Sequence, residues 1–211
     1  MAGKGKFITF EGGEGAGKST QARKLKAALE ARGHPVLLTR EPGGSPGAEQ
    51  IRGLLVEGDK DRWTALAETL LFLAARADHL ARLIEPSLTQ GFWVVCDRFS
   101  DSTFVYQGIA RGLGVEKVRR LHEAAFGALK PDLTLILDLP AEEGLRRAQE
   151  RGEGAETRFE KFDIGFHEKL RNAFAALAVE EPKRCVLIDG TRDAETVAAS
   201  VWAKVEERLD P

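Results

Sequence analysis

Residues 12–20 read "GGEGAGKST", and this stretch determines the fold class of the chain. It contains a glycine, four intervening residues and then Gly-Lys-Ser, which is the Walker A pattern. An apolar run at 6–11 precedes it and a helical pattern at 18–32 follows it, as a loop between a strand and a helix requires. Backbone N–H groups in such a loop point at phosphate oxygens, and the helix N-terminus adds a positive dipole. The stretch therefore predicts a P-loop that binds a nucleoside triphosphate.

Two side chains in this loop have direct chemical roles. Lys18 is placed to reach the β- and γ-phosphates, and the Ser19 hydroxyl is placed to ligate Mg²⁺. The chain has no Asp-x-x-Gly motif and no Asn/Thr-Lys-x-Asp motif, so it lacks the signature of GTP-binding switches. We expect ATP, with Mg²⁺ as cofactor. The predicted ATP-binding residues of the loop are Gly12, Gly13, Glu14, Gly15, Ala16, Gly17, Lys18, Ser19 and Thr20.

Glu14 works against phosphate binding, because it places a negative charge inside this loop. Two unit charges about 5 Å apart, at an effective dielectric constant of about 20, repel each other by roughly 3 kcal/mol. The carboxylate therefore needs a function of its own and a cation that offsets its charge.

Short apolar runs alternate with longer amphipathic stretches along the whole chain. The runs at 6–11, 35–40, 92–97, 133–139 and 185–189 predict strands that are apolar on both faces, as in a covered parallel sheet. Helical patterns follow at 18–32, 46–57, 63–90, 101–127 with a break near Gly112–Gly114, 141–151, 160–180 and 193–209. This alternation predicts an α/β fold, P-loop NTPase-like, with a doubly wound five-stranded parallel sheet and helices on both faces. No linker divides residues 1–211, so we expect a single domain.

The helical pattern at 63–90 has the clearest periodicity. Apolar side chains that recur every three or four residues predict a stripe facing the core, at Leu66, Leu70, Leu73, Ala77, Leu80 and Ile84. Phe72 and Arg76 are four residues apart and share a face at the edge of this stripe.

Composition excludes several classes of protein. With 31 Lys and Arg against 33 Asp and Glu, the net charge is −2, and we expect no nucleic acid polymer as partner. The N-terminus lacks the apolar region of a signal peptide, and no apolar run approaches the ~18 residues of a membrane span. Cys96 and Cys185 lie inside apolar runs and predict buried free thiols in a reducing compartment. We therefore expect a cytoplasmic protein.

Three further motifs accompany the P-loop: "TREPGG" at 39–44, "LLFLAARADHL" at 70–80 and "DRFSDSTFVYQG" at 97–108. Together with "FEGGEGAGKSTQ" at 10–21, they resemble the signature set of the thymidylate kinases, over essentially the whole chain. The resemblance implies the reaction ATP + dTMP → ADP + dTDP. Because relatives in the family are homodimers, it also implies a homodimer. Another nucleoside monophosphate kinase is the alternative enzyme. A nucleotide-binding module that signals through partners is the alternative of another class.

Asp97 and Arg98 end a predicted strand, which is where ligands bind in α/β folds. Asp97 resembles a Walker B acid that reaches Mg²⁺ through water. Arg98 suits a forked bond to the acceptor's phosphate and a catalytic role. A purely structural ion pair between the two residues is the alternative.

The remaining motifs predict the dTMP pocket. Phe72 offers a flat face for a base, although its pattern alone fits a core position equally well, and Arg76 offers a donor for a base-edge carbonyl. In the family, the matching residues stack on thymine and bond its edge. Four residues of the next helix are expected to close the base and sugar side: Ser102, Thr103, Tyr106 and Gln107.

The resemblance assigns further roles at single positions. Tyr106 resembles the family's aromatic residue that crowds a ribose 2′-position. Glu14 resembles the family's acidic residue that accepts a hydrogen bond from the 3′-hydroxyl of the acceptor. Arg40 is either a phosphate ligand or an ion-pair partner, and Arg52 is a weaker phosphate candidate. Arg192 lies where the adenine pocket forms in the family.

The segment at about 147–160, "RAQERGEGAETRFE", predicts a small mobile lid. It resembles the family branch that carries its catalytic arginines in the lid rather than in the P-loop. Arg147, Arg151 and Arg158 are therefore the candidates for offsetting Glu14 and for catalysis. Each arginine alone fits a solvated surface equally well, but at least one of the three is expected to be catalytic.

Overall fold

The structure is a computed structural model of the 211-residue chain, and it describes residues 5–150 and 158–211. Five parallel strands form one sheet in the order β2-β3-β1-β4-β5. The strands are β1 (Phe7–Glu11), β2 (Val36–Arg40), β3 (Trp93–Asp97), β4 (Leu133–Asp138) and β5 (Cys185–Asp189). All five predicted strands and the α/β fold class are confirmed, because apolar runs that are buried on both faces suit a covered parallel sheet.

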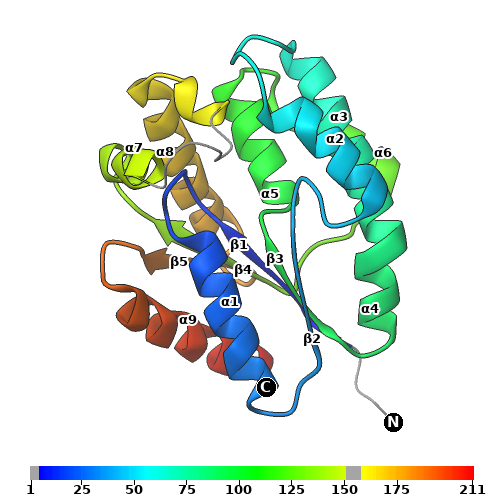
Figure 1. The fold of residues 1–211 in the computed structure, drawn as a ribbon, viewed down its shortest axis with the longest axis vertical. Helices are drawn as coiled ribbons and strands as arrows, with labels where there is room; N and C mark the ends of the chain where they lie inside the picture. Colours follow the sequence, from blue (N-terminus) through cyan, green and yellow to red (C-terminus); the bar gives the residue numbers. More distant parts are fainter. Residues whose placement is uncertain (1–4, 151–157) are drawn as a thin grey trace.

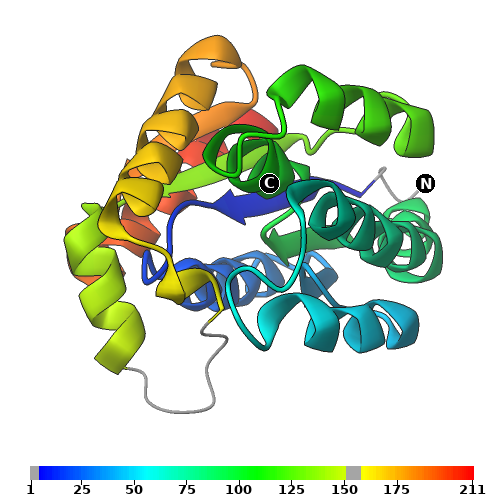
Figure 2. The same ribbon diagram turned by 90° about the horizontal axis from the view of Figure 1, so that it is seen from above.

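Helices lie on both sides of this sheet (Figures 1 and 2). The α-helices are α1 (Lys18–Glu30), α2 (Pro46–Val56), α3 (Ala65–His79), α4 (Glu85–Thr89), α5 (Ser100–Thr103), α6 (Val115–Phe126), α7 (Ala141–Glu150), α8 (Ile164–Glu180) and α9 (Ala194–Leu209). The π-helical segments are η1 (Leu80–Ile84) and η2 (Phe104–Ala110), and η3 (Phe159–Lys161) is a 3₁₀ turn. The predicted break near Gly112–Gly114 is confirmed, since η2 ends before it and α6 begins after it. None of the helices in the described ranges is long and apolar enough to span a membrane.

Successive side chains of a strand point to opposite faces of the sheet and therefore pack into different hydrophobic clusters. On one face, Ile8 and Phe10 pack with α1 and α9, which contribute Leu25 and Val201. On the other face, one cluster joins β4 and β5 to η2 and α8, and another joins β1 and β3 to η1. Both cysteines are free and buried, as predicted. Hydrophobic clusters therefore pack against both faces of the sheet.

The predicted core stripe of the long helical pattern is only partly correct. Leu73, Leu80 and Ile84 are buried, but Leu66 and Leu70 are 37% and 48% exposed, and Ala77 is exposed as well. The buried face of α3 instead carries polar side chains, namely Glu68, Thr69, Arg76 and His79. Periodicity located the helix but misjudged its orientation, because these polar groups have buried partners that a sequence pattern does not reveal.

Candidate active site

A single pocket of about 840 Å³ holds most of the predicted site residues. It is lined by the P-loop and Arg192 and also by side chains of α3, β3, α5 and η2. The predicted residues that line it are Glu14, Gly15, Ala16, Gly17, Lys18, Ser19, Thr20, Arg40, Arg52, Phe72, Arg76, Asp97, Arg98, Ser102, Thr103, Tyr106, Gln107, Arg147 and Arg192. Gly12, Gly13 and Arg158 do not line it, and Arg151 lies outside the described residues.

The P-loop needs its glycines for two separate reasons. Gly15 and Gly17 have φ values of +66° and +89°, in the left-handed region that other residues avoid. Gly15 also touches Gly144 at the start of α7, where an added Cβ would lie 1.9 Å from the Gly144 carbonyl oxygen. A Cβ added to Gly144 would in turn lie 2.4 Å from the Glu14 carbonyl oxygen. The phosphate loop and α7 are therefore in direct backbone contact.

Lys18 folds back over the P-loop. Its Nζ donates to the carbonyl oxygens of Gly12, at 3.2 Å, and of Gly13, at 2.6 Å. Burial and the Arg98 charge lower the pKa of Lys18 to about 8, against the opposing effect of Glu14. The ammonium is thus predominantly charged at pH 7 and already lies inside the predicted phosphate site.

Among the described residues, the cation that pairs with Glu14 is Arg98, and it is neither Arg147 nor Arg158. Arg98 Nη2 lies 3.0 Å from Glu14 Oε1, and the Tyr106 hydroxyl donates to the same oxygen at 2.8 Å. Burial opposes the ionisation of Glu14, but Arg98, Lys18 and the Tyr106 hydroxyl outweigh it and lower its pKa to about 2. The carboxylate is therefore charged at neutral pH and points toward the β3–η2 side of the pocket.

Arg98 links the two halves of the pocket. Its Nη1 donates to the Gly12 carbonyl oxygen at 3.0 Å and to Ser102 Oγ at 3.1 Å. Its backbone has φ +67°, a left-handed conformation that costs a non-glycine residue about 1–3 kcal/mol. Such a conformation persists only where surrounding contacts hold it. One such contact is the hydrogen bond that the Arg98 N–H donates to the Phe10 carbonyl oxygen at 2.9 Å.

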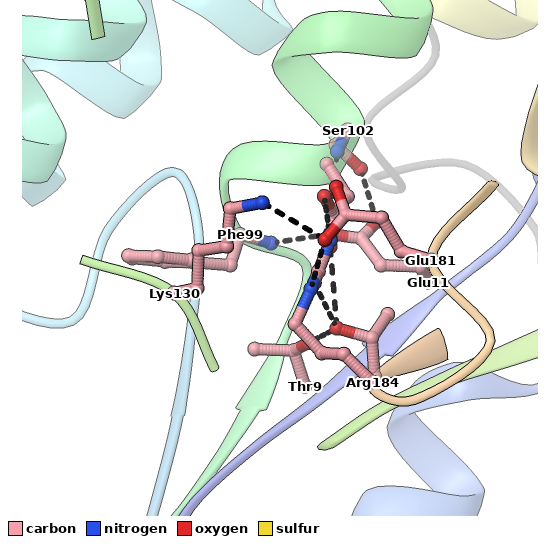
Figure 3. A network of polar contacts seen from close by, with 9 residues as sticks. Thr9, Glu11, Phe99, Ser102, Lys130, Glu181 and Arg184 are labelled. Atoms are coloured by element: carbon pink, nitrogen blue, oxygen red, sulfur yellow. Dashed lines mark hydrogen bonds and ion pairs between the residues drawn. The ribbon is translucent and has the colours of Figure 1, made fainter. Parts of the chain in front are cut away.

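Glu11 is a second support of this turn, and the sequence analysis missed it (Figure 3). Its Oε1 accepts from the N–H groups of Phe99 and Ser102, at 2.8 and 3.2 Å, and its Oε2 accepts from Ser102 Oγ at 2.6 Å. Burial and the nearby Asp101 raise the pKa of Glu11 to about 7. Asp101 itself pairs with Arg184 at 2.6 Å. The sequence signal that could have identified Glu11 is its position as an acidic residue at the end of the apolar run at 6–11.

Arg76 is held in the pocket wall by a buried carboxylate. Its Nε donates to Glu41 Oε2 at 2.7 Å, and its Nη2 donates to Thr103 Oγ1 at 3.0 Å. Its Nη1 is buried and has no hydrogen-bond partner in the described ranges. Glu41 also contacts His79 Nδ1 at 3.1 Å. The guanidinium therefore has one donor group left for a ligand, and Glu41 is a positioning residue that the motif contained without an assigned role.

Phe72 and Tyr106 form an aromatic wall together with Phe159. The ring centroid of Phe159 lies 6.3 Å from that of Phe72 and 5.5 Å from that of Tyr106. Phe72 is only partly buried and lines the pocket, whereas a pure core residue would be covered. Phe159 had no predicted role, because it lies inside the segment that was interpreted as a lid, where only the arginines were assigned.

The other charged candidates have partners at the pocket rim. The Ser19 hydroxyl donates to Asp97 Oδ2, so the predicted metal pair is assembled. Arg40 lies 3.1 Å from both carboxylate oxygens of Glu49. Arg192 Nε lies 3.4 Å from an Asp189 oxygen on the surface. Arg40 thus forms the ion pair that was one of its two predicted roles while it still lines the pocket.

The described arginines of the predicted lid behave differently from each other. Arg147 Nε lies 2.8 Å from Glu143 Oε1, its Nη1 donates to Gly190 O, and the side chain lines the pocket. Arg158 is fully buried and donates to the carbonyl oxygens of residues 55, 59 and 60. With those donors occupied, Arg158 does not reach the phosphate loop in this arrangement.

The chain is similar to proteins named thymidylate kinase in all three comparisons. The family model for thymidylate kinase matches residues 10–201. A thymidylate kinase from Bradyrhizobium sp. strain BTAi1 is 55% identical over 208 residues, which cover 98% of this chain and 92% of that protein. One from Ruegeria pomeroyi is 55% identical over 210 residues, covering 100% and 99%. A solved structure of thymidylate kinase from Ehrlichia chaffeensis superposes with a TM-score of 0.76, at 33% identity, and covers 96% of this chain and 99% of that one.

Proposed function

The chain belongs to the thymidylate kinase family, and from this premise we propose that it transfers the γ-phosphate of ATP to dTMP, forming ADP and dTDP. The observation that carries the proposal is the continuity of the pocket. One cavity joins the P-loop to the wall that contains Phe72 and Arg76. ATP occupies the P-loop end, and dTMP occupies the other end with its phosphate at Arg98.

The reaction needs alignment and positive charge more than it needs a base. The second pKa of a phosphate monoester is about 6, so the acceptor is largely dianionic at pH 7. Lys18 and Arg98 bring fixed cations to the two phosphates, and Arg147 adds a third at the pocket wall. Glu14 orients Arg98 and Tyr106. As the family resemblance implies, it also accepts a hydrogen bond from the 3′-hydroxyl of dTMP. Bound together, the two substrates would displace water from the pocket, which limits hydrolysis of ATP.

Mg²⁺ fits the residues at the mouth of the P-loop. Ser19 offers a hydroxyl oxygen and Asp97 a carboxylate, and the two are hydrogen-bonded to each other. Mg²⁺ typically takes one or two protein oxygens and completes its shell with substrate phosphates and water. Once bound, the ion neutralises charge on the transferred phosphate.

ADP formation with dTMP, dUMP, CMP, UMP, AMP and GMP as acceptors tests the assignment. Preferential turnover of dTMP is expected. Preference for another acceptor would indicate another nucleoside monophosphate kinase, and absence of turnover with all six would favour a nucleotide-binding module.

Replacing Phe72 with alanine should raise the KM for dTMP at least about 5-fold, because base–aromatic stacking contributes about 1–3 kcal/mol. The KM for ATP should stay nearly unchanged. Steady-state kinetics against both substrates make the measurement. Phe104→Ala is the matched control, since Phe104 packs on His122 and does not line the pocket. If Phe72→Ala only lowers the melting temperature, Phe72 is a core residue and the base platform is misplaced.

Arg147→Ala should lower kcat about 10-fold while changing either KM much less, because the charge that Arg147 stabilises develops in the transition state. The neighbouring Arg146 provides a matched control. It belongs to the same helix but pairs with Glu143 and Glu150 and does not line the pocket. Equal kinetics for Arg147→Ala and Arg146→Ala would remove Arg147 from the catalytic set. Arg158 is left out of that set because its donors are occupied, and Arg151 stays a candidate from the sequence alone.

The protein is also proposed to act as a single domain and as a cytoplasmic homodimer. Leu66 and Leu70 expose an apolar face of α3, which suits contact with a second copy. Sedimentation should give twice the monomer mass, and Leu70→Lys should give the monomer. Leu187→Lys, on an equally exposed leucine of β5, should leave the mass unchanged. A wild-type monomer, or a dimer that survives Leu70→Lys, would contradict this interface.

A further inference from the structure

Glu68 is a fully buried carboxylate on α3, the helix that brings Phe72 and Arg76 to the pocket, and the mechanism above does not use it. Its Oε2 lies 2.5 Å from Arg158 Nη2, and its Oε1 lies 3.7 Å from Arg111 Nε. These two guanidinium groups supply the positive charge that a buried carboxylate requires. A third polar neighbour is Gln107 on η2, whose Nε2 donates to Glu68 Oε1 at 2.9 Å.

This contact determines which way the Gln107 amide points. A side-chain amide has a donor end and an acceptor end of nearly the same shape, so only its partners distinguish them. A carboxylate accepts hydrogen bonds and does not donate them. Glu68 therefore binds the NH₂ end of Gln107 and leaves Oε1 as the polar atom available to the pocket, which Gln107 lines. Oε1 accepts no hydrogen bond from the described part of the chain.

Among the described residues, this part of the pocket wall therefore holds a donor and an acceptor that have no hydrogen-bond partner in the protein. The donor is Nη1 of Arg76, and the acceptor is Oε1 of Gln107; both residues are almost completely buried. Thymine and uracil carry a carbonyl O4 beside an N3–H, which complements a donor beside an acceptor. Cytosine carries an amino group beside an unprotonated N3, which places donor against donor and acceptor against acceptor.

We propose that Glu68 is a positioning residue that sets base specificity: by holding the amide of Gln107 in one orientation, it selects pyrimidines that carry an N3–H over cytosine. The proposal rests on the proposed function, since it concerns the acceptor base of that reaction. It assigns no role in distinguishing thymine from uracil, which have the same N3–H and O4.

The experiment compares kcat/KM for dTMP, dCMP and dUMP in wild type and in Glu68→Gln. A glutamine at position 68 both donates and accepts, so the Gln107 amide is free to turn. The dTMP/dCMP ratio should fall by about 10-fold or more, the scale of one mispaired buried hydrogen bond, while the dTMP/dUMP ratio stays constant. These ratios are independent of the folded fraction, because both substrates meet the same enzyme preparation. An unchanged dTMP/dCMP ratio would overturn the proposal, as would an equal fall in both ratios.

Glu68→Gln leaves the buried Arg158 and the partly buried Arg111 without the Glu68 carboxylate, so a second variant restores the charge balance. Glu68→Gln/Arg111→Gln has the same formal charge in this cluster as wild type. It should show the same loss of dTMP/dCMP selectivity. Arg111→Gln alone is the matched control, because it keeps the Glu68–Gln107 hydrogen bond and should keep the ratio. A fall in the ratio with Arg111→Gln alone would assign the effect to general loosening of the wall and contradict the role of Glu68.

If neither Glu68 variant folds, the wild-type protein decides the question. The side-chain NH₂ hydrogens of Gln107 should be protected from exchange, with or without dTMP, and unprotected NH₂ hydrogens would overturn the proposal. Failure of the proposed function has a different signature. A wild-type enzyme that prefers dCMP to dTMP, or uses neither, would refute the thymidylate kinase reaction itself. A dTMP-selective wild type with fully selective variants would refute only the inference about Glu68.

Discussion

Lys18→Ala should reduce kcat by at least about 10³-fold while the protein stays folded. Cationic groups on a transferring phosphoryl group contribute on this scale, because they stabilise charge that moves in the transition state. The structure explains why folding should survive. Within residues 5–150 and 158–211, the Nζ of Lys18 bonds only to the carbonyl oxygens of Gly12 and Gly13 in its own loop, and it joins no distant elements. Turnover is measured as ADP formation with dTMP, and folding as the thermal melting transition.

Lys24→Ala is the control for Lys18→Ala. Lys24 is on the same helix, α1, and its ammonium pairs with Glu195 on α9 at the surface, so near-normal activity is expected. A well-folded Lys18→Ala enzyme with near-normal kcat would refute the P-loop as the site of phosphoryl transfer.

Glu14→Ala should weaken dTMP binding about 10- to 150-fold and change ATP affinity little. One charge-assisted hydrogen bond to the 3′-hydroxyl contributes about 1.5–3 kcal/mol. Loss of Glu14 also removes the anion that holds Arg98 Nη2 at 3.0 Å and the Tyr106 hydroxyl at 2.8 Å. ATP binding is expected to be unchanged or slightly stronger, since a repulsive charge has left the phosphate loop.

A 3′-deoxy analogue of dTMP separates the direct contact from the effect through Arg98. The analogue should bind wild type poorly, and Glu14→Ala should bind it about as well as dTMP. Protein and ligand then form the two arms of a double-mutant cycle. Simple addition of the two losses would mean that Glu14 does not contact the hydroxyl and acts only by orienting Arg98 and Tyr106.

The strands and the phosphate loop were predictable because their signals are local. The Walker A spacing and five apolar runs located β1 to β5 to within one residue at each end. The partner of Glu14 was not predictable in this way. Arg98 is 84 positions away along the chain, and only the strand order β3-β1 brings the two side chains together.

The sequence did not reveal the roles of the buried carboxylates. Glu11, Glu41 and Glu68 are almost completely inaccessible, yet each resembles an ordinary polar residue at a strand end or on a helix. Their partners come from other elements, namely Phe99, Arg76 and Gln107. For the same reason the exposed leucines of α3 were assigned to the core: periodicity reports that a helix has an apolar face, but it does not report what covers that face.

The contact between Gly15 and Gly144 has a consequence for the mutational tolerance of the protein. Neither position has room for even a methyl group, because each faces a backbone carbonyl oxygen of the other segment. Position 144 lies on an otherwise ordinary amphipathic helix, where a sequence library would treat alanine as a harmless choice. Any such library should keep both glycines, since a side chain at either one would displace the helix that carries Arg147 from the loop that holds the nucleotide.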